Sequence, residues 1–247
     1  MSSPLPELSS SHLDALASVS TATISTRLFA LGLRNQVLAG LRLLTLSGTR
    51  MIGAAFTLRY IPAREDLDNL GVFEDVEHPQ RKAIETCPVG QVLVMDCRGE
   101  VRAASAGHIL MTRLEVRGVA GCVTDGTLRD TPNIERLRLP VYSAGASAMT
   151  NLAIHHAVDI NVPIGCAGVA VFPGDLMVGD AEGVVCVPRH LVEVIAEPAR
   201  AQERLEEYLL DRIRAGAPLS GTYPPDAKTL AKYLAHTSAH HDDGVTR

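Results

Sequence analysis

The residues between 91 and 124 constrain the fold of this chain more than any other stretch. Gln91–Asp96 and Gly121–Thr124 are short apolar runs that predict buried strands. Between them, Ile109–Arg117 has helical spacing, and Gly118 is a typical helix end. A strand, a helix and a strand in this order form a crossover unit whose strands lie parallel. We therefore expect an α/β protein, with mixed sheets and flanking helices.

The other elements follow from the same periodicities. Further helices are expected at Thr21–Leu31, Gln80–Thr86, Leu191–Arg214 and Lys228–Ala235, and further strands at Met51–Arg59 and Pro140–Ala144. Asn161–Pro188 has a different sequence pattern, in which Gly and Pro recur at short intervals between Val-rich segments. That pattern predicts short strands joined by tight turns.

The two ends of the chain differ in composition from a globular domain. Residues 1–11 are rich in Ser and Pro and are expected to form a flexible N-terminus. Residues 237–247 are expected to form a disordered tail. Residues 12–236 then make up a single domain with a C-terminal helical extension, a length that is ample for a sizeable core.

Charge and cysteine content exclude several classes of function. With a net charge of -5 and a pI of about 6.0, the chain lacks the excess of basic residues that is typical of proteins that bind nucleic acid. No apolar run reaches the roughly 18 residues of a membrane span, and the first basic residue is Arg27, so we expect neither a membrane partner nor a signal peptide. The five cysteines are dispersed and lack a CxxC pair, which indicates free core thiols. We expect a soluble, cytoplasmic protein.

Small residues lead into a helix at Ala103–Leu110 (AASAGHIL). The first backbone N–H groups of a helix lack internal partners, and Gly107 leaves room for close approach. The segment therefore predicts a cradle for a carboxylate or phosphate, although a plain strand-to-helix turn would have the same sequence.

Thr124–Asp130 (TDGTLRD) follows a predicted strand and so lies at a carboxyl edge of the sheet, where open α/β sheets bind ligands. The planar fork of Arg129 suits a carboxylate, and the oxygens of Asp130 suit Mg²⁺ or Mn²⁺. The alternative from spacing alone is a surface arginine and an aspartate that caps a helix starting near Pro132.

Other polar residues are interpreted as structural. Adjacent residues of a strand point to opposite faces, so His155 and His156 are poorly placed to share a metal. Asp175 and Asp180 lie among glycines and are expected in turns.

Several motifs in a fixed order resemble the RraA-like family, which includes class II 4-hydroxy-4-methyl-2-oxoglutarate aldolases with oxaloacetate decarboxylase activity and regulators of RNase E. The most specific motif is DGTLRD at Asp125–Asp130, supported by FPGD at Phe172–Asp175 and DAEGVVCVP at Asp180–Pro188. AGHIL at Ala106–Leu110 adds to it, and the resemblance covers about Thr21 to Arg214.

The resemblance implies a swivelling β/β/α sandwich that assembles as a homotrimer or a hexamer, with active sites between subunits. It implies that Arg129 binds the substrate carboxylate, that Asp130 binds the metal, and that Gly107, His108, Ile109 and Leu110 line the substrate cradle. Two positions depart from the family pattern. His108 stands where an acidic or small residue is common, and the residues after Asp130 supply no acid. His108 either touches substrate or is simply exposed.

The function implied is a divalent-metal-dependent lyase, with Mg²⁺ first and Mn²⁺ second as the cofactor. Arg129 and the amides near Ile109 and Leu110 fix the carboxylate of a 2-oxo acid, and C–C cleavage or oxaloacetate decarboxylation leaves a pyruvate enolate. A metal-bound water serves as the base. Dehydration of a 2-keto-3-deoxy sugar acid is the alternative reaction, and a non-catalytic regulator that binds a ribonuclease is the alternative of another class.

Overall fold

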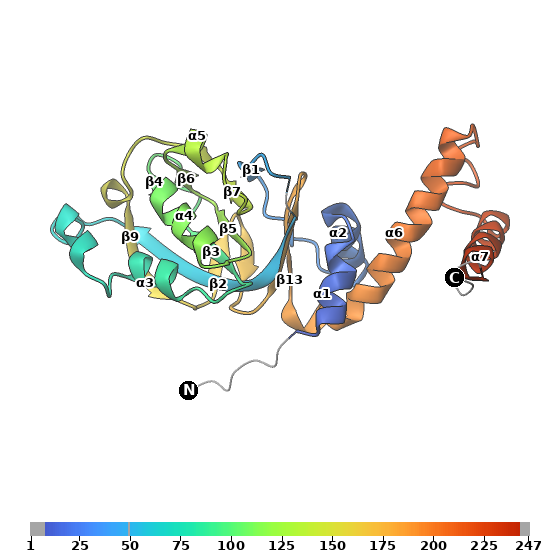
Figure 1. Ribbon diagram of the computed structural model, residues 1–247, viewed down its shortest axis with the longest axis horizontal. Helices are drawn as coiled ribbons and strands as arrows, with labels where there is room; N and C mark the ends of the chain where they lie inside the picture. The colour runs from blue at the N-terminus through green and yellow to red at the C-terminus, as the bar shows by residue number, and fades with distance from the viewer. Residues whose placement is uncertain (1–7, 49, 243–247) are drawn as a thin grey trace.

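The computed structural model describes residues 8–48 and 50–242, and it is an α/β protein built on one large mixed sheet (Figure 1). The strands are β1 (Arg42–Leu43), β2 (Met51–Pro62), β3 (Val92–Asp96), β4 (Ala104–Ala106), β5 (Gly121–Thr124), β6 (Thr127–Leu128), β7 (Val141–Ser143), β8 (Gly145–Ala146), β9 (His155–Ile160), β10 (Ile164–Cys166), β11 (Val169–Val171), β12 (Leu176–Asp180) and β13 (Gly183–Val187). The α-helices are α1 (Ser10–Ala17), α2 (Thr21–Ala30), α3 (Pro79–Thr86), α4 (His108–Val116), α5 (Thr131–Ile134), α6 (Val192–Arg214) and α7 (Ala227–Asp242). Short 3-10 helices are η1 (Leu70–Glu74), η2 (Asn151–Ala153) and η3 (Arg189–Leu191).

The large sheet is organised around β2, whose 12 residues pair with three other strands. β2, β3, β5 and β7 run parallel to one another. The start of β2 pairs antiparallel with β12, and its end pairs antiparallel with β9 after a bulge between Arg59 and Tyr60. β2 therefore joins the parallel half of the sheet to the antiparallel half.

A second, smaller sheet contains β4, β6 and β8, all parallel. Its strands are only two or three residues long, and each ends in a loop or a helix start on the same side. β4 leads into α4, and β6 leads into α5. The carboxyl ends of β4 and β6 are thus neighbours, and they carry the candidate site.

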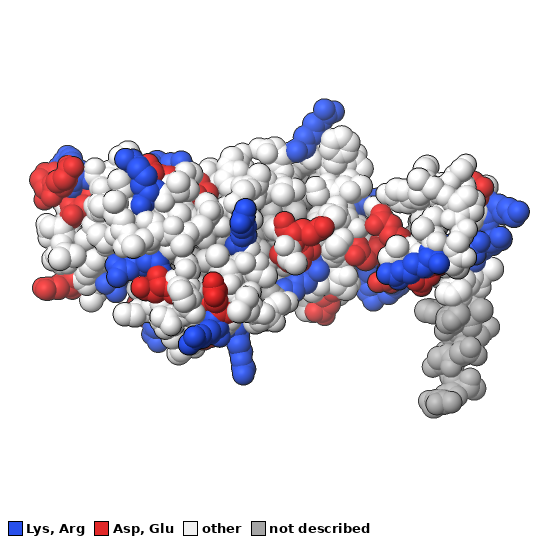
Figure 2. Space-filling view, turned by 90° about the horizontal axis from the view of Figure 1, so that it is seen from above, with Lys and Arg blue, Asp and Glu red and all other residues white. Residues whose placement is uncertain are grey.

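Three apolar clusters hold the layers together. α3 and α4 bury residues such as Ile84 and Met111 against one face of the large sheet, and the β10–β11 hairpin contributes to the cluster on the other face. α1, α2 and the first half of α6 pack on β12 and β13. The rest of α6 extends away from the sheets and carries α7 at its far end (Figure 1). Acidic and basic side chains are scattered among uncharged ones over the face drawn in Figure 2.

Most expected elements are confirmed within a few residues. β3, α4 and β5 form the predicted crossover with parallel strands, and the segment after residue 161 folds into two antiparallel hairpins, as its glycines and prolines predict. None of the helices in the described ranges has the length and apolar character that a bilayer crossing needs.

Two expectations at the ends are corrected. Ser10 and Ser11 belong to α1 rather than to a flexible segment. Residues 237–242, expected to be disordered, continue α7, because the helical pattern predicted from Lys228 runs on without a Gly or Pro to stop it. The rest of both expected flexible ends, residues 1–7 and 243–247, lies outside the described residues.

Candidate functional site

Two parallel strands bring Gly107, Arg129 and Asp130 together. β4 pairs with β6 so that Ala106 faces Leu128, and the Arg129 N–H donates to the Ala106 carbonyl at 3.0 Å. Each strand ends at that point, so the residue after β4 lies beside the two residues after β6. The sequence predicted only that Arg129 and Asp130 lie at the carboxyl edge of the sheet that contains Gly121–Thr124. In the structure they follow β6 of the smaller sheet, beside Gly107.

Gly107 is in contact with both charged residues. A Cβ atom at this position would lie 2.9 Å from Arg129 Cγ and 2.9 Å from Asp130 Oδ2, closer than real Cβ contacts come. The backbone of Gly107 is extended, a conformation open to any residue. Glycine is therefore required here for close approach, not for backbone freedom.

Asp130 is held in a left-handed conformation, with φ 60° and ψ 30°. It occupies the N-cap position of α5, but its side chain makes no capping hydrogen bond. The sequence alternative, an aspartate whose side chain caps a helix, is therefore wrong. Aspartate tolerates this conformation better than most residues, and such outliers are frequent at functional sites.

The carboxylate of Asp130 is open to a ligand. Its nearest charged partner is Arg129, whose Nε lies 3.6 Å from Oδ2, too far for a hydrogen bond. The two side chains are 47% and 43% exposed, so the pair is a weak surface contact in high dielectric. Both the guanidinium and the carboxylate can turn to a bound molecule at little cost.

The N-terminus of α4 faces the same place. Gly107 is its N-cap residue and has no side chain to satisfy the first amides. The Leu110 N–H already donates to the Gly107 carbonyl at 3.1 Å, so the expectation that this amide holds a carboxylate is not met. Within the described ranges, the amides of His108 and Ile109 have no protein acceptor, and these two remain for an anion. The His108 side chain is half-buried, and that of Ile109 is 80% exposed.

A cavity of about 230 Å³ joins these groups. Its lining comprises Phe73, Gln80, Arg81, Ala104, Ala106, Gly107, Ile109, Leu110, Arg129, Asp130, Thr150 and Asn151. Drug-sized ligands usually occupy roughly 300–1,000 Å³, so the cavity suits a small organic acid. Arg81, Asn151 and Phe73 were not predicted from the sequence. A weak signal existed, because Arg81 is a cation in the first turn of a helix that begins at a proline.

The Asp125 carboxylate of the DGTLRD motif has a different role. It is buried and accepts hydrogen bonds from the backbone N–H groups of Cys97 (2.6 Å), Gly99 (2.9 Å) and Ala167 (3.2 Å). Burial raises the pKa of this carboxyl, and the three backbone donors oppose that shift. Asp125 thus ties two loops to the end of β5.

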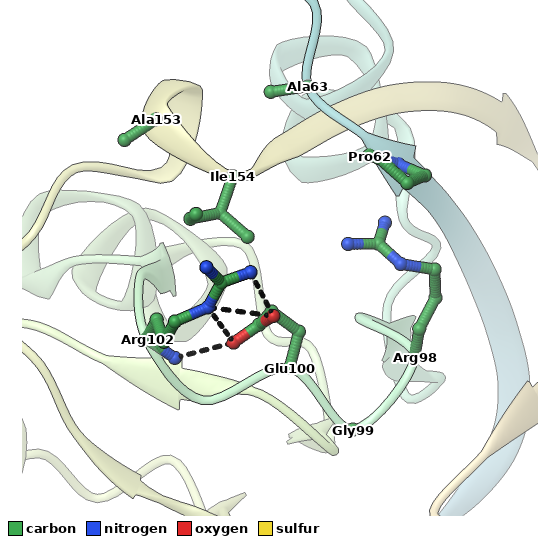
Figure 3. Close-up of a pocket in the computed structure, with 8 residues that line it drawn as sticks. All are labelled: Pro62, Ala63, Arg98, Gly99, Glu100, Arg102, Ala153 and Ile154. Atoms are coloured by element: carbon green, nitrogen blue, oxygen red, sulfur yellow. Dashed lines mark hydrogen bonds and ion pairs between the residues drawn. The ribbon is translucent and has the colours of Figure 1, made fainter.

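A second cavity, of about 440 Å³, lies between residues 62–63, 98–102 and 153–154 (Figure 3). Arg102 binds both carboxylate oxygens of Glu100 and lowers the pKa of that carboxyl to about 2. Arg98 extends across the opposite side of the cavity (Figure 3). The single acid of this cavity is held in an ion pair, so we take the smaller cavity as the candidate site.

The two neighbouring histidines are separated, as predicted. His155 is buried with its Nε2 3.1 Å from the Ala103 carbonyl, whereas His156 Nδ1 lies 2.8 Å from Asp68 Oδ1. Asp175 and Asp180 have structural bonds: Asp175 accepts from the Phe172 N–H, and Asp180 holds the start of α2.

The groups present fit a divalent cation only in part. No cluster of three or more His, Cys, Asp or Glu side chains suited to a metal occurs in residues 8–48 and 50–242. Asp130 offers one carboxylate at the cavity, at a place where a Cβ on Gly107 would crowd it. Mg²⁺ is commonly bound by one or two carboxylates, with water and substrate completing its shell, so a single aspartate is compatible with it.

Comparison with known proteins places this site in a family. The model of the RraA-like family, described as Aldolase/RraA, matches residues 21–186, which include every residue of the smaller cavity. The chain belongs to the RraA-like family. Its fold is the RraA-like fold, a mixed α/β arrangement with flanking helices.

Three relatives illustrate the range of the RraA-like family. A Halalkalibacterium halodurans protein, provisionally named as a 4-hydroxy-4-methyl-2-oxoglutarate aldolase, is 35% identical over 144 residues, which are 57% of this chain and 62% of that protein. An uncharacterized protein from Pseudomonas syringae pv. tomato has a similar structure, with a TM-score of 0.75 and 27% identity over 89% of this chain and 100% of that one. Streptomyces coelicolor RraAS2, described as an unusual member of the RNase ES inhibitor RraA protein family, has a TM-score of 0.72 and 30% identity over 83% of this chain and 98% of its own. This chain thus aligns with less than two thirds of the length of the relative named as an aldolase.

Proposed function

We propose that this RraA-like protein is a lyase that cleaves a carbon–carbon bond of a 2-oxo acid with the help of a divalent cation. One observation carries the proposal. Gly107, Arg129 and Asp130 meet at a small cavity, with a weakly paired carboxylate, a guanidinium and free helix amides side by side. An aspartate that only caps a helix and an arginine that is only exposed would not need to lie together beside a cavity.

Different residues bind the substrate carboxylate and the cation. Arg129 binds the substrate carboxylate through its planar fork, and the amides of His108 and Ile109 add donors at the positive end of α4. Asp130 holds the divalent cation, Mg²⁺ or else Mn²⁺. When bound, the cation supplies Lewis-acid stabilisation of the negative charge that develops on the keto oxygen. Gly107 keeps Arg129 and Asp130 at the spacing that a 2-oxo acid needs.

The chain offers no route through a Schiff base at this cavity. Lysine occurs only at positions 82, 228 and 232, and none of the three is among the residues that line the cavity. Lys82 is paired with Glu77 on the surface. Electrostatic stabilisation of the developing charge is thus the mechanism that these residues support.

The proposal is tested by pyruvate release from 4-hydroxy-4-methyl-2-oxoglutarate and from oxaloacetate, followed with a coupled dehydrogenase. We expect activity with Mg²⁺ and none with a chelator. Loss of one charge-stabilising group at an active site costs about 10²–10³-fold in kcat, and we expect at least that loss in Asp130→Asn and Arg129→Met. Asp211→Asn, in an exposed ion pair of α6, is the matched control and should be unchanged.

Activity that survives both chelation and Asp130→Asn would overturn the metal-dependent reaction. A panel of 2-keto-3-deoxy sugar acids is assayed in parallel, because the same 2-oxo acid site would serve a dehydratase. Loss of substrate without release of pyruvate would replace the lyase with that reaction.

The relationship to RraAS2 favours a second candidate, a protein that binds and inhibits a ribonuclease. The two functions are separated by a ribonuclease inhibition assay with the wild type and Asp130→Asn. Inhibition that both proteins share, together with no lyase activity in either, would favour the binding role.

We also propose that the protein is a homo-oligomer, a trimer or a hexamer. Asp130 is the one carboxylate in the lining of the cavity among the described residues, and a six-coordinate cation has room for ligands from a neighbouring copy. Light scattering coupled to gel filtration measures the mass directly, and a monomer would contradict this part of the proposal.

A further inference from the structure

Arg81 presents an unpaired guanidinium to the site cavity. It lies in α3 and lines the cavity together with Arg129 and Asp130. Its guanidinium carbon lies 4.7 Å from the centre of the Phe73 ring, a cation–π contact that holds the plane in place. Its Nε is buried without an acceptor, and in the described part of the chain it forms no ion pair.

The position of Arg81 within its helix is electrostatically unfavourable. It is the third residue of α3, in the first turn, where the helix dipole already concentrates positive charge. That turn contains no acidic residue. The nearby carboxylate of Asp68 is occupied by His156 and by the Arg64 N–H, each at 2.8 Å. Burial, and next the charge of Arg81, lower the pKa of His78, a residue that can carry only positive charge and so cannot offset that of Arg81.

α3 and α4 direct their N-termini to the same cavity. Gln80 and Arg81 at the start of α3 line it, as do Ile109 and Leu110 at the start of α4. Arg113 of α4 binds Glu85 near the end of α3 through Nη2 at 2.8 Å, which keeps the two helices side by side with the same polarity. The cavity thus receives the positive ends of two helices in addition to two arginines.

Asn151 adds a further donor without an acceptor. The residue is 6% exposed, lines the cavity from η2, and its Nδ2 is buried with no hydrogen-bond partner. A buried unsatisfied donor is costly and uncommon in native proteins. An acceptor group on a bound molecule would satisfy it after a small rotation of the amide.

We infer that Arg81, assisted by Asn151, selects 2-oxo acids that carry a second carboxylate at the end remote from the keto group. The inference rests on the proposed function, since it assumes that Arg129 and Asp130 hold the 2-oxo acid end. The ionised side chains in the lining are Arg81, Arg129 and Asp130, two cations and one anion. A cation at Asp130 makes the cavity more positive still, so a substrate with two carboxylates balances its charge better than a substrate with one.

The test uses two acids that differ only at the remote end, 2-oxoglutarate and 2-oxopentanoate. Binding to the full-length protein is measured by titration calorimetry in saturating Mg²⁺. Removing one hydrogen bond to a charged group changes affinity by about tenfold or more. We expect the wild type to bind 2-oxoglutarate at least about tenfold more tightly than 2-oxopentanoate.

Substitutions assign that preference to a residue. Arg81→Met keeps an apolar side chain beside Phe73 and should raise the Kd of 2-oxoglutarate about tenfold or more, with the Kd of 2-oxopentanoate within about twofold of wild type. Arg129→Met should weaken the binding of both acids. Lys82→Met removes one positive charge from the next position of α3 and should change neither Kd, which controls for net charge. Thermal melting of each variant confirms that it is folded.

The outcomes separate the two proposals. Equal affinity of the wild type for both acids, or equal weakening of both by Arg81→Met, would overturn the role of Arg81 and leave the 2-oxo acid site intact. Failure of the wild type to bind either acid would overturn the proposed function as well.

Discussion

Replacing Gly107 with alanine should impair the site while leaving the fold intact. The added Cβ would lie 2.9 Å from Arg129 Cγ and 2.9 Å from Asp130 Oδ2, whereas ordinary contact begins at 3.4 Å. Each of these side chains must therefore yield by about 0.5 Å, the difference between the two distances. Both are nearly half exposed and can rotate away, so the free energy of unfolding should change by less than about 1 kcal/mol. Misplacement of a reacting group by about 1 Å costs about 100-fold in rate, so we expect kcat/KM to fall about 10- to 100-fold.

Two measurements on the same preparation test this expectation. Urea unfolding gives the stability, and pyruvate release from the best substrate gives kcat/KM. Gly165→Ala in β10 is the matched control, because a Cβ there meets nothing within 4 Å and its φ is not positive. Wild-type kcat/KM in Gly107→Ala would refute the argument that close packing sets the spacing of Arg129 and Asp130. A large loss of stability would refute the claim that the contact belongs to the site alone.

Three further predictions concern buried titratable groups. Asp125→Asn must place an amide donor against at least one of its three backbone donors, and so should lower the free energy of unfolding by about 1–3 kcal/mol, measured in urea. Burial lowers the pKa of His155 in the folded protein. Its contribution to stability is therefore present above about pH 6.5 and is lost as the pH falls through the folded pKa. Between pH 7.5 and pH 5.5, the free energy of unfolding should fall less in His155→Gln than in the wild type. All five thiols are buried and free, and burial raises the pKa of Cys97 to about 12, so a thiol reagent should label them only after denaturation; rapid labelling of the native protein would contradict this.

Periodicity predicted the elements of the fold well where they are long. The β3–α4–β5 crossover and the helices α2 and α6 follow from patterns that repeat over many residues. The small sheet of β4, β6 and β8 was not predicted as such, because two- or three-residue strands among glycines and small residues show no period. The pairing of β2 with β12 was also beyond local patterns, since it joins residues more than a hundred positions apart.

The site was predicted unevenly for a similar reason. Arg129, Asp130 and Gly107 lie in short motifs that can be read directly, and the structure brings them together. Arg81 and Asn151 reach the same cavity from segments that carry no motif, so only the three-dimensional structure shows them. Spacing could not decide whether Asp130 caps its helix. That question depends on a backbone conformation that the sequence does not encode locally.

The residues that line the cavity fall into two groups according to their place in the chain. Gly107, Arg129 and Asp130 belong to one continuous stretch, whereas Phe73, Arg81 and Asn151 come from outside it. Substitutions in the second group can change which molecule fits without disturbing the first. If the proposed function holds, duplicated genes could diverge toward new substrates by a few changes in the second group, with Gly107, Arg129 and Asp130 inherited unaltered.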